Sequence, residues 1–177
     1  MGGFVQRLAV LWGFITLSIT LLGGLRDHPD PPRPDTSQAE LAQLGQEYGD
    51  LRVWASAIAV AADTLPASNT EAAQVLADQM ARLLRPLEQD FERTTASLST
   101  AQLEIILPLW ERMAFAHAGL VMLQEEADSL GSDPGLEPMA LHNLADQLSA
   151  VLDFATDIQE QVLDRLTTPP PTPIRAI

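Results

Sequence analysis

Five carboxylate side chains recur at short intervals near the end of the chain, in a stretch with the apolar periodicity of a helix. Their separations of seven, four, three and four residues place them on one face of that helix, opposite its apolar seam. Carboxylates in such a row can bind divalent cations or a basic partner, although most charge rows on helices are simply solvated. We interpret the row as a solvated face, with a partner or cation surface as the alternative. The row consists of Asp146, Asp153, Asp157, Glu160 and Asp164.

The histidines are the other residues that could bind a metal, and their positions argue against a shared site. Only His117 and His142 fall within predicted helices, whereas His28 precedes them. If the helices pair as neighbours in a bundle, His117 and His142 lie about 12 Å apart along the axis, too far to share one ion. The Glu-x-x-His spacing of di-iron bundles does not occur. We therefore expect no metal and no cofactor.

Residues for nucleophilic or redox catalysis are also missing from the sequence. The chain has no cysteine, which excludes disulfides, thiolate nucleophiles and cysteine-ligated metals. It contains no G-x-S-x-G elbow, no P-loop and no dinucleotide-binding fingerprint. A formal net charge of −14 disfavours contact with nucleic-acid phosphates. These observations predict a protein that is neither an enzyme nor a nucleic-acid-binding protein.

One level of the predicted helices could accommodate a small ligand. Pro86 and Pro108 should fall close together there, and each removes a backbone hydrogen bond and favours a kink. Tyr48 and Trp110 fall nearby, and His117 follows Trp110 two turns later on the same apolar stripe. A ligand pocket is one interpretation, and two tolerated kinks beside ordinary core aromatics is the other. For His117 we expect a buried, neutral ring that is hydrogen-bonded to a neighbouring group.

Four segments have the apolar spacing of amphipathic helices, and three of them begin with a capping-box pattern. The patterns are Ser37-x-x-Glu40, Ser68-x-x-Glu71 and Ser99-x-x-Gln102. They predict helices over residues 37–65, over 68–98, and from 99 to a turn at 131–135 that contains Gly and Pro. A fourth helix follows this turn and ends before Pro169.

The predicted core consists of the apolar residues that recur every three or four positions along each helix. In the first helix these are Leu41, Leu44, Tyr48, Leu51, Ala55, Ile58, Ala62 and Leu65. In the second helix they are Leu76, Met80, Leu83, Leu87, Phe91 and Leu98. In the third helix they are Leu103, Ile106, Trp110, Met113, His117, Leu120 and Ala127. In the fourth helix they are Leu141, Leu144, Leu148, Val151, Ala155, Ile158 and Val162. Helices of similar length joined by short turns predict an all-α fold, an antiparallel up-down-up-down four-helix bundle. Facing residues of its first and fourth helices should have numbers that add to about 204.

Eighteen uncharged residues, Leu8 to Leu25, precede the predicted bundle and lie between Arg7 and Arg26. As a helix they span about 27 Å, close to the thickness of a bilayer core. The run lacks well-placed small residues for a signal-peptidase site, so we predict an uncleaved N-terminal signal-anchor helix within residues 1–25. Cleavage, which would release a secreted protein, is the alternative. A buried soluble helix is less favoured because the run has no polar face.

Proline-rich segments flank the predicted bundle domain at residues 37–168. The linker at 26–36 contains four prolines, which favour an extended spacer of roughly 3 Å per residue. The tail at 169–177 has a similar composition and a PxxP pattern, and we interpret it as disordered rather than as a docking motif. This organisation predicts a membrane-tethered, extracytoplasmic (periplasmic) protein that acts on a protein partner as an accessory or scaffold subunit. The alternative is a ligand-binding or sensing bundle that works with a separate membrane partner.

Overall fold

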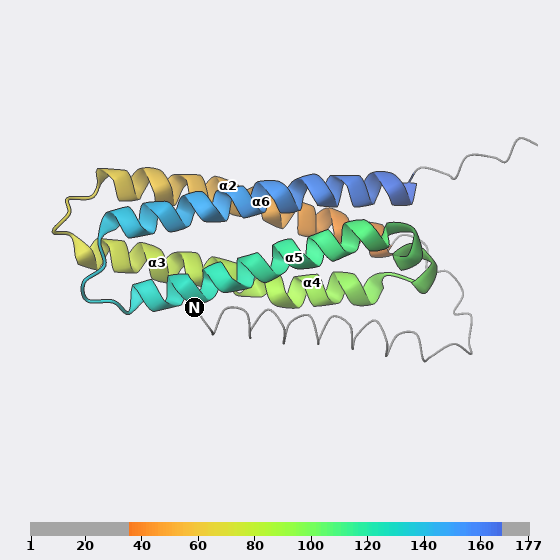
Figure 1. Ribbon diagram of the computed structural model, residues 1–177, viewed down its shortest axis with the longest axis horizontal. Coiled ribbons are helices and arrows are strands. Elements are labelled where there is room, and N and C mark those ends of the chain that lie inside the picture. Colours follow the sequence, from red (N-terminus) through yellow and green to blue (C-terminus); the bar gives the residue numbers. More distant parts are fainter. Residues whose placement is uncertain (1–35, 168–177) are drawn as a thin grey trace, which may run out of the picture. The chain divides into compact units, whose positions relative to one another are not determined.

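The computed structural model describes residues 36–167, and every regular element in this range is a helix (Figure 1). The helices are α2 (Thr36–Thr64), α3 (Thr70–Leu84), α4 (Pro86–Ser97), α5 (Thr100–Gly131) and α6 (Pro138–Thr167). The described part of the chain is therefore all-helical, as the sequence predicts. The predicted anchor within residues 1–25, the linker up to residue 35 and the tail at 169–177 lie outside the described residues.

Side chains cap the starts of α3 and α5. At α5 the predicted capping box is confirmed, because the Ser99 amide donates to Gln102 Oε1 at 2.9 Å and the Gln102 amide donates to Ser99 Oγ at 3.3 Å. At α3 the cap is Asn69, whose side chain accepts a hydrogen bond from the Ala72 amide at 3.3 Å. The predicted cap, Ser68, is wrong by one residue, because Asn and Ser are comparable N-caps and both stand at this turn.

Ser37 lies inside the first turn of α2, so the predicted capping box at its start is wrong. Its side chain is buried, and its Oγ accepts a hydrogen bond from Gln102 Nε2 at 2.8 Å. A buried hydroxyl needs such a partner. Ser37 therefore connects the start of α2 to the start of α5 instead of capping its own helix.

The single helix predicted over residues 68–98 is interrupted at Arg85. Pro86 has no amide hydrogen, so the carbonyl four residues before it loses its helical partner. Arg85 itself keeps helical angles, φ −56° and ψ −38°, and its amide donates to the Ala81 carbonyl at 3.1 Å. The interruption is therefore local, and α3 and α4 follow one another as two parts of one helical segment. Pro108, by contrast, lies within α5 without ending it.

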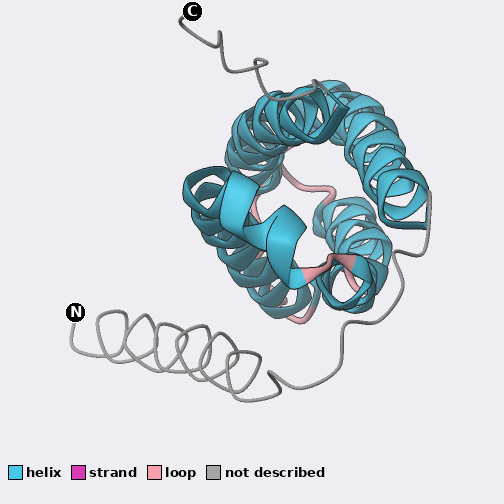
Figure 2. Ribbon diagram, turned by 90° about the vertical axis from the view of Figure 1, so that its right-hand side faces the viewer, coloured by secondary structure: helices cyan, strands magenta, loops and turns pink. Residues whose placement is uncertain are grey.

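Buried apolar residues of all five helices form one hydrophobic core. The end-on view in Figure 2 shows the helices arranged around a common centre. The predicted seam is confirmed along most of α2, α5 and α6, but it is displaced at two places. In α6 the fully buried residue is Leu152, whereas Val151 is only partly buried. In α3 small residues replace the predicted leucines, since Ala73 and Ala77 are buried while Leu76 and Leu83 are only partly buried. An amphipathic helix buries an apolar stripe at least about 100° wide, so residues beside a strict heptad seam are also buried.

Helices α2 and α6 share the most extensive interface in the described region and lie side by side in Figure 1. Gly45 faces the side chain of Gln159, which is the register that the sequence predicts. Further along, Arg52 Nη1 donates to Asp153 Oδ1 at 2.8 Å. Residue numbers therefore rise along α2 as they fall along α6.

Gly45 allows this close approach because a side chain at that position would overlap Gln159. A Cβ atom built on Gly45 would lie 2.5 Å from the Gln159 Cδ atom. The Gln159 amide group is buried against α2, and its Nε2 donates to the Leu41 carbonyl at 2.8 Å. A larger residue at 45 must displace this group and break its buried hydrogen bond.

We expect Gly45→Ala to lower the free energy of unfolding by about 1–3 kcal/mol, the usual cost of overpacking a close contact. Gly49→Ala is the matched control, because it lies one turn away on the same helix and has no atom within 4 Å of the added Cβ. That control should gain up to about 1 kcal/mol from the higher helix propensity of alanine. Urea denaturation of both variants measures the difference, and equal stabilisation of the two would contradict the close packing at Gly45.

Candidate interaction surface on α5 and α6

Helix α5 is unusually apolar on the outside. An 18-residue window within it has a mean hydropathy of 1.2 and no more than two charged residues, yet only 33% of the window is buried. By length and composition it is the one helix within residues 36–167 that could cross a membrane, a criterion that core helices of soluble proteins also meet. Four large apolar side chains of α5 are exposed, namely Ile105, Leu107, Phe115 and Met122. An exposed apolar face of this kind is typical of a contact surface.

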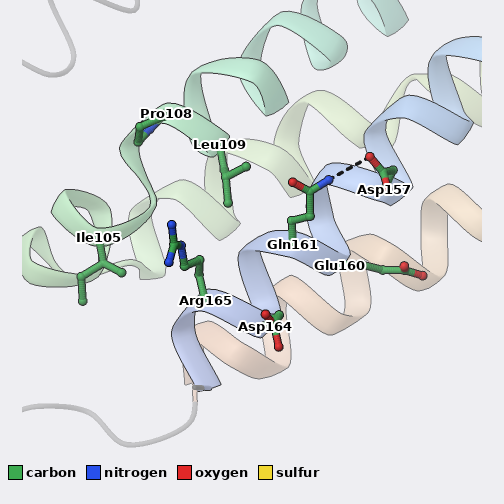
Figure 3. A pocket seen from close by; sticks show the side chains of 8 residues that line it. All are labelled: Ile105, Pro108, Leu109, Asp157, Glu160, Gln161, Asp164 and Arg165. Carbon is green, nitrogen blue, oxygen red and sulfur yellow. Dashed lines mark hydrogen bonds between the residues drawn. The ribbon is translucent and has the colours of Figure 1, made fainter. Parts of the chain in front are cut away.

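A groove of about 600 Å³ lies between α5 and α6 at the start of α5 (Figure 3). Its α5 side is apolar, and its α6 side carries three carboxylates, an amide and one guanidinium. Gln161 and Arg165 point toward α5, and Gln161 Nε2 donates to Asp157 Oδ2 at 2.8 Å. We call this feature the α5–α6 groove. Its lining residues are Ile105, Pro108, Leu109, Asp157, Glu160, Gln161, Asp164 and Arg165.

All five carboxylates of the predicted row are exposed on α6, and three of them line the groove. Two others have partners, since Asp153 pairs with Arg52 at 2.8 Å and Asp146 lies 3.3 Å from His142 Nε2. His142 Nδ1 also lies 3.1 Å from Asp63 on α2. Among the described residues no three His, Asp or Glu side chains come together as metal ligands. The row is therefore divided between the groove, which three of its carboxylates line, and polar contacts at Asp146 and Asp153.

The residues predicted to form a ligand pocket are placed differently from that prediction. Trp110 and His117 lie on the two sides of Phe91, with ring centroids 5.2 Å and 4.3 Å from it and interplanar angles of 6° and 11°. Tyr48 is not part of this stack, and it is fully buried in α2. Of the two prolines, Pro108 lines the α5–α6 groove and Pro86 does not. Trp110 and His117 therefore pack against Phe91 in the described region.

His117 is buried, as the sequence predicts, but the expected hydrogen bond to its ring is not present at Nδ1. That atom is buried without a hydrogen-bond partner, and the ring instead stacks on Phe91. Burial lowers the pKa of His117 from 6.5 to about 4, because a charged ring would lose its hydration. The neutral imidazole therefore behaves here as a flat, mainly apolar core side chain.

The hydroxyl oxygen of Tyr48 is, like Nδ1 of His117, a buried polar atom. Its side chain is fully buried, and its hydroxyl has no hydrogen-bond partner among the described residues. Burial raises the pKa of the Tyr48 hydroxyl, and the neighbouring Glu47 carboxylate raises it further. The phenol therefore stays neutral and contributes to the core mainly through its ring.

Sequence reasoning missed the residues that make this surface. It assigned α5 by its inward stripe and gave no role to Phe115, Met122 or Phe154, which are all exposed. The signal was available, because Phe115 and Met122 are seven residues apart and lie off the inward stripe. Phe91 was assigned to the core, but its position between Trp110 and His117 depends on the tertiary structure.

Comparisons with protein-family models, with curated proteins and with solved structures found no match to this chain. The functional interpretation therefore depends on the surface itself.

Proposed function

We propose that this protein is a membrane-tethered, extracytoplasmic four-helix bundle that acts through protein–protein contacts as an accessory or scaffold subunit. The observation that carries the proposal is the exposed apolar face of α5, beside the α5–α6 groove. Exposed large apolar side chains such as Phe115 and Met122 are typical of a surface that a partner covers. The proposal includes no catalytic activity.

The proposed bundle is antiparallel, with α3 and α4 together forming its second helix. Three contacts support this arrangement. Gly45 faces Gln159 and Arg52 pairs with Asp153, which supports opposite directions for α2 and α6. Gly119 of α5 lies against Val151 of α6, at the register expected for neighbouring antiparallel helices.

The proposed tether is the apolar run Leu8 to Leu25, followed by the proline-rich linker. Its length fits one bilayer crossing, and the absence of a favourable cleavage site supports retention. An extracytoplasmic location is the default for a domain that follows a short N-terminal segment of this kind.

A small-ligand function remains the second candidate, and the α5–α6 groove is the observation that favours it. Its volume of about 600 Å³ falls within the range of ligand sites. The carboxylates on its α6 side favour a cationic ligand. We rank this function second because seven of the eight residues that line the groove are exposed to solvent.

The test is membrane fractionation of the full chain, followed by mild detergent extraction and purification. We expect the chain in the membrane fraction at its full length, with associated protein whose amount falls when Phe115 is replaced by Asp. Val75→Asp is the matched control, because Val75 is also exposed but lies on α3. A soluble mature protein that begins near residue 24 would exclude the tether. Equal association in both variants would exclude α5 as the contact surface.

A further inference from the structure

The exposed apolar residues of α5 form a line that runs along the helix from the groove. Pro108, Phe115 and Met122 are spaced by seven residues, so their side chains project from nearly the same face. Phe115 and Met122 are 65% and 44% exposed. We call these three residues the α5 line. It covers about 20 Å of helix, which matches a partner helix of four turns.

Acidic side chains border the α5 line on both sides. On α5 itself, Glu104 and Glu111 are exposed. They lie four residues before Pro108 and Phe115 respectively, so each is a surface neighbour of a residue of the line. On α6, Asp157 and Glu160 border the groove into which the line leads. The surface is therefore an apolar line between two mainly acidic margins, which also contain Arg112 on α5 and Arg165 on α6.

A cation already contacts an aromatic ring on this surface. The guanidinium carbon of Arg112 lies 5.3 Å from the centroid of the Phe154 ring, which belongs to α6. This distance is typical of a cation–π contact. An arginine from a partner could make the same kind of contact with the exposed Phe115 ring.

Charge decides which occupant suits the surface. Anionic lipid headgroups and a second copy of this chain would both bring negative charge against the acidic margins, and the chain has a net charge of −14. A basic partner would gain from the same margins. We propose that the α5 line binds an amphipathic helix of a partner protein, with an apolar ridge flanked on both sides by Lys or Arg. This inference rests on the proposed function and specifies the chemistry of the partner.

The experiment uses the full chain in mild detergent and an 18-residue amphipathic peptide built from Leu and Lys. Because the chain has no cysteine, Ser129→Cys gives a single attachment point for an environment-sensitive fluorophore, seven residues beyond Met122. Gln89→Cys on α4 gives a matched label away from the surface. Two further peptides serve as controls, one with Glu in place of Lys and one with the same Leu and Lys residues in scrambled order.

We expect saturable binding of the Leu–Lys helix at label 129 and no saturable change at label 89. Phe115→Ser with Met122→Ser should weaken binding by about tenfold, because these side chains supply most of the buried apolar area. Glu111→Gln, Asp157→Asn and Glu160→Gln together should weaken it by about fivefold at low salt and by less at high salt. The control changes Val75→Ser and Glu88→Gln should leave affinity within about twofold.

Equal binding of the scrambled or Glu-containing peptide would overturn the proposal, because neither presents a basic amphipathic helix. The proposal would also be overturned if the Phe115→Ser and Met122→Ser variant lost self-association but kept its peptide binding. Failure of this proposal and failure of the proposed function give different results in these experiments. Peptide binding without any co-purified protein would contradict the accessory role alone, whereas co-purification that survives the α5 changes would contradict the site alone.

Discussion

Replacement of Leu152 by Ala should lower the free energy of unfolding by about 2–5 kcal/mol, the usual cost of truncating a buried leucine. Leu152 is fully buried in α6 and belongs to the single hydrophobic core. Its truncation leaves a cavity between packed helices that cannot close fully. The fold should survive with a lower midpoint in urea, and circular dichroism of the native state should be unchanged.

Val151→Ala is the control for this prediction, because a strict heptad series places Val151 rather than Leu152 in the core. Val151 is partly buried and packs beside Gly119 of α5. Its truncation should cost about 1 kcal/mol, less than that of Leu152. If Val151→Ala proved the more damaging change, the placement of Leu152 rather than Val151 in the core would be wrong.

Acidification should destabilise the protein through His117, by up to about 3 kcal/mol between neutral pH and pH 4. Burial lowers the pKa of His117 from 6.5 to about 4 in the folded state. Between these values the unfolded chain binds a proton that the folded chain does not, so stability falls as the pH falls. The part of the folding stability that depends on a neutral His117 ring is therefore fully present above pH 6.5. It is lost as the pH falls to about 4.

His117→Phe isolates this effect, since phenylalanine can keep the stack on Phe91 without titrating. Unfolding free energies of the two proteins, measured in urea from pH 7 to pH 4, should diverge as the pH falls. The carboxylates titrate in both proteins, so their contribution cancels in the difference. Parallel curves would show that the His117 ring is not held neutral by burial.

Local signals predicted the helices well because they depend on neighbouring residues. The Ser99 capping box and the inward stripe of α2 follow from spacing alone, and both were predicted. The register between α2 and α6 was also predicted, because short turns and equal helix lengths leave few alternatives. The residue-by-residue placement in α3 and α6 was less accurate, since the buried stripe is wider than a strict heptad seam and includes Ala77 and Leu152.

The candidate site was harder to predict because it depends on which faces remain uncovered. The acidic row was identified, yet its neighbours Ile105 and Pro108 come from a different helix and join it only in three dimensions. The packing of Trp110 and His117 was hard to predict for the same reason. Phe91 enters the space beside Trp110 and His117, and no spacing rule states how far an aromatic ring reaches across a helix interface.

The pairing of α2 with α6 also determines how this domain would respond to a mechanical load. Contacts such as that between the Gln159 amide and the Leu41 carbonyl lie near residues 36 and 167, at the same end of the helix pair (Figure 1). A force that pulls these two residues apart acts across the helix axes. It would therefore separate α6 from α2 one contact at a time, starting at the ends near residues 36 and 167, instead of stretching all the contacts together. A domain held from one end of its chain and pulled from the other would yield at low force, and residues of the α2–α6 interface such as Leu41 and Leu44 would be uncovered first.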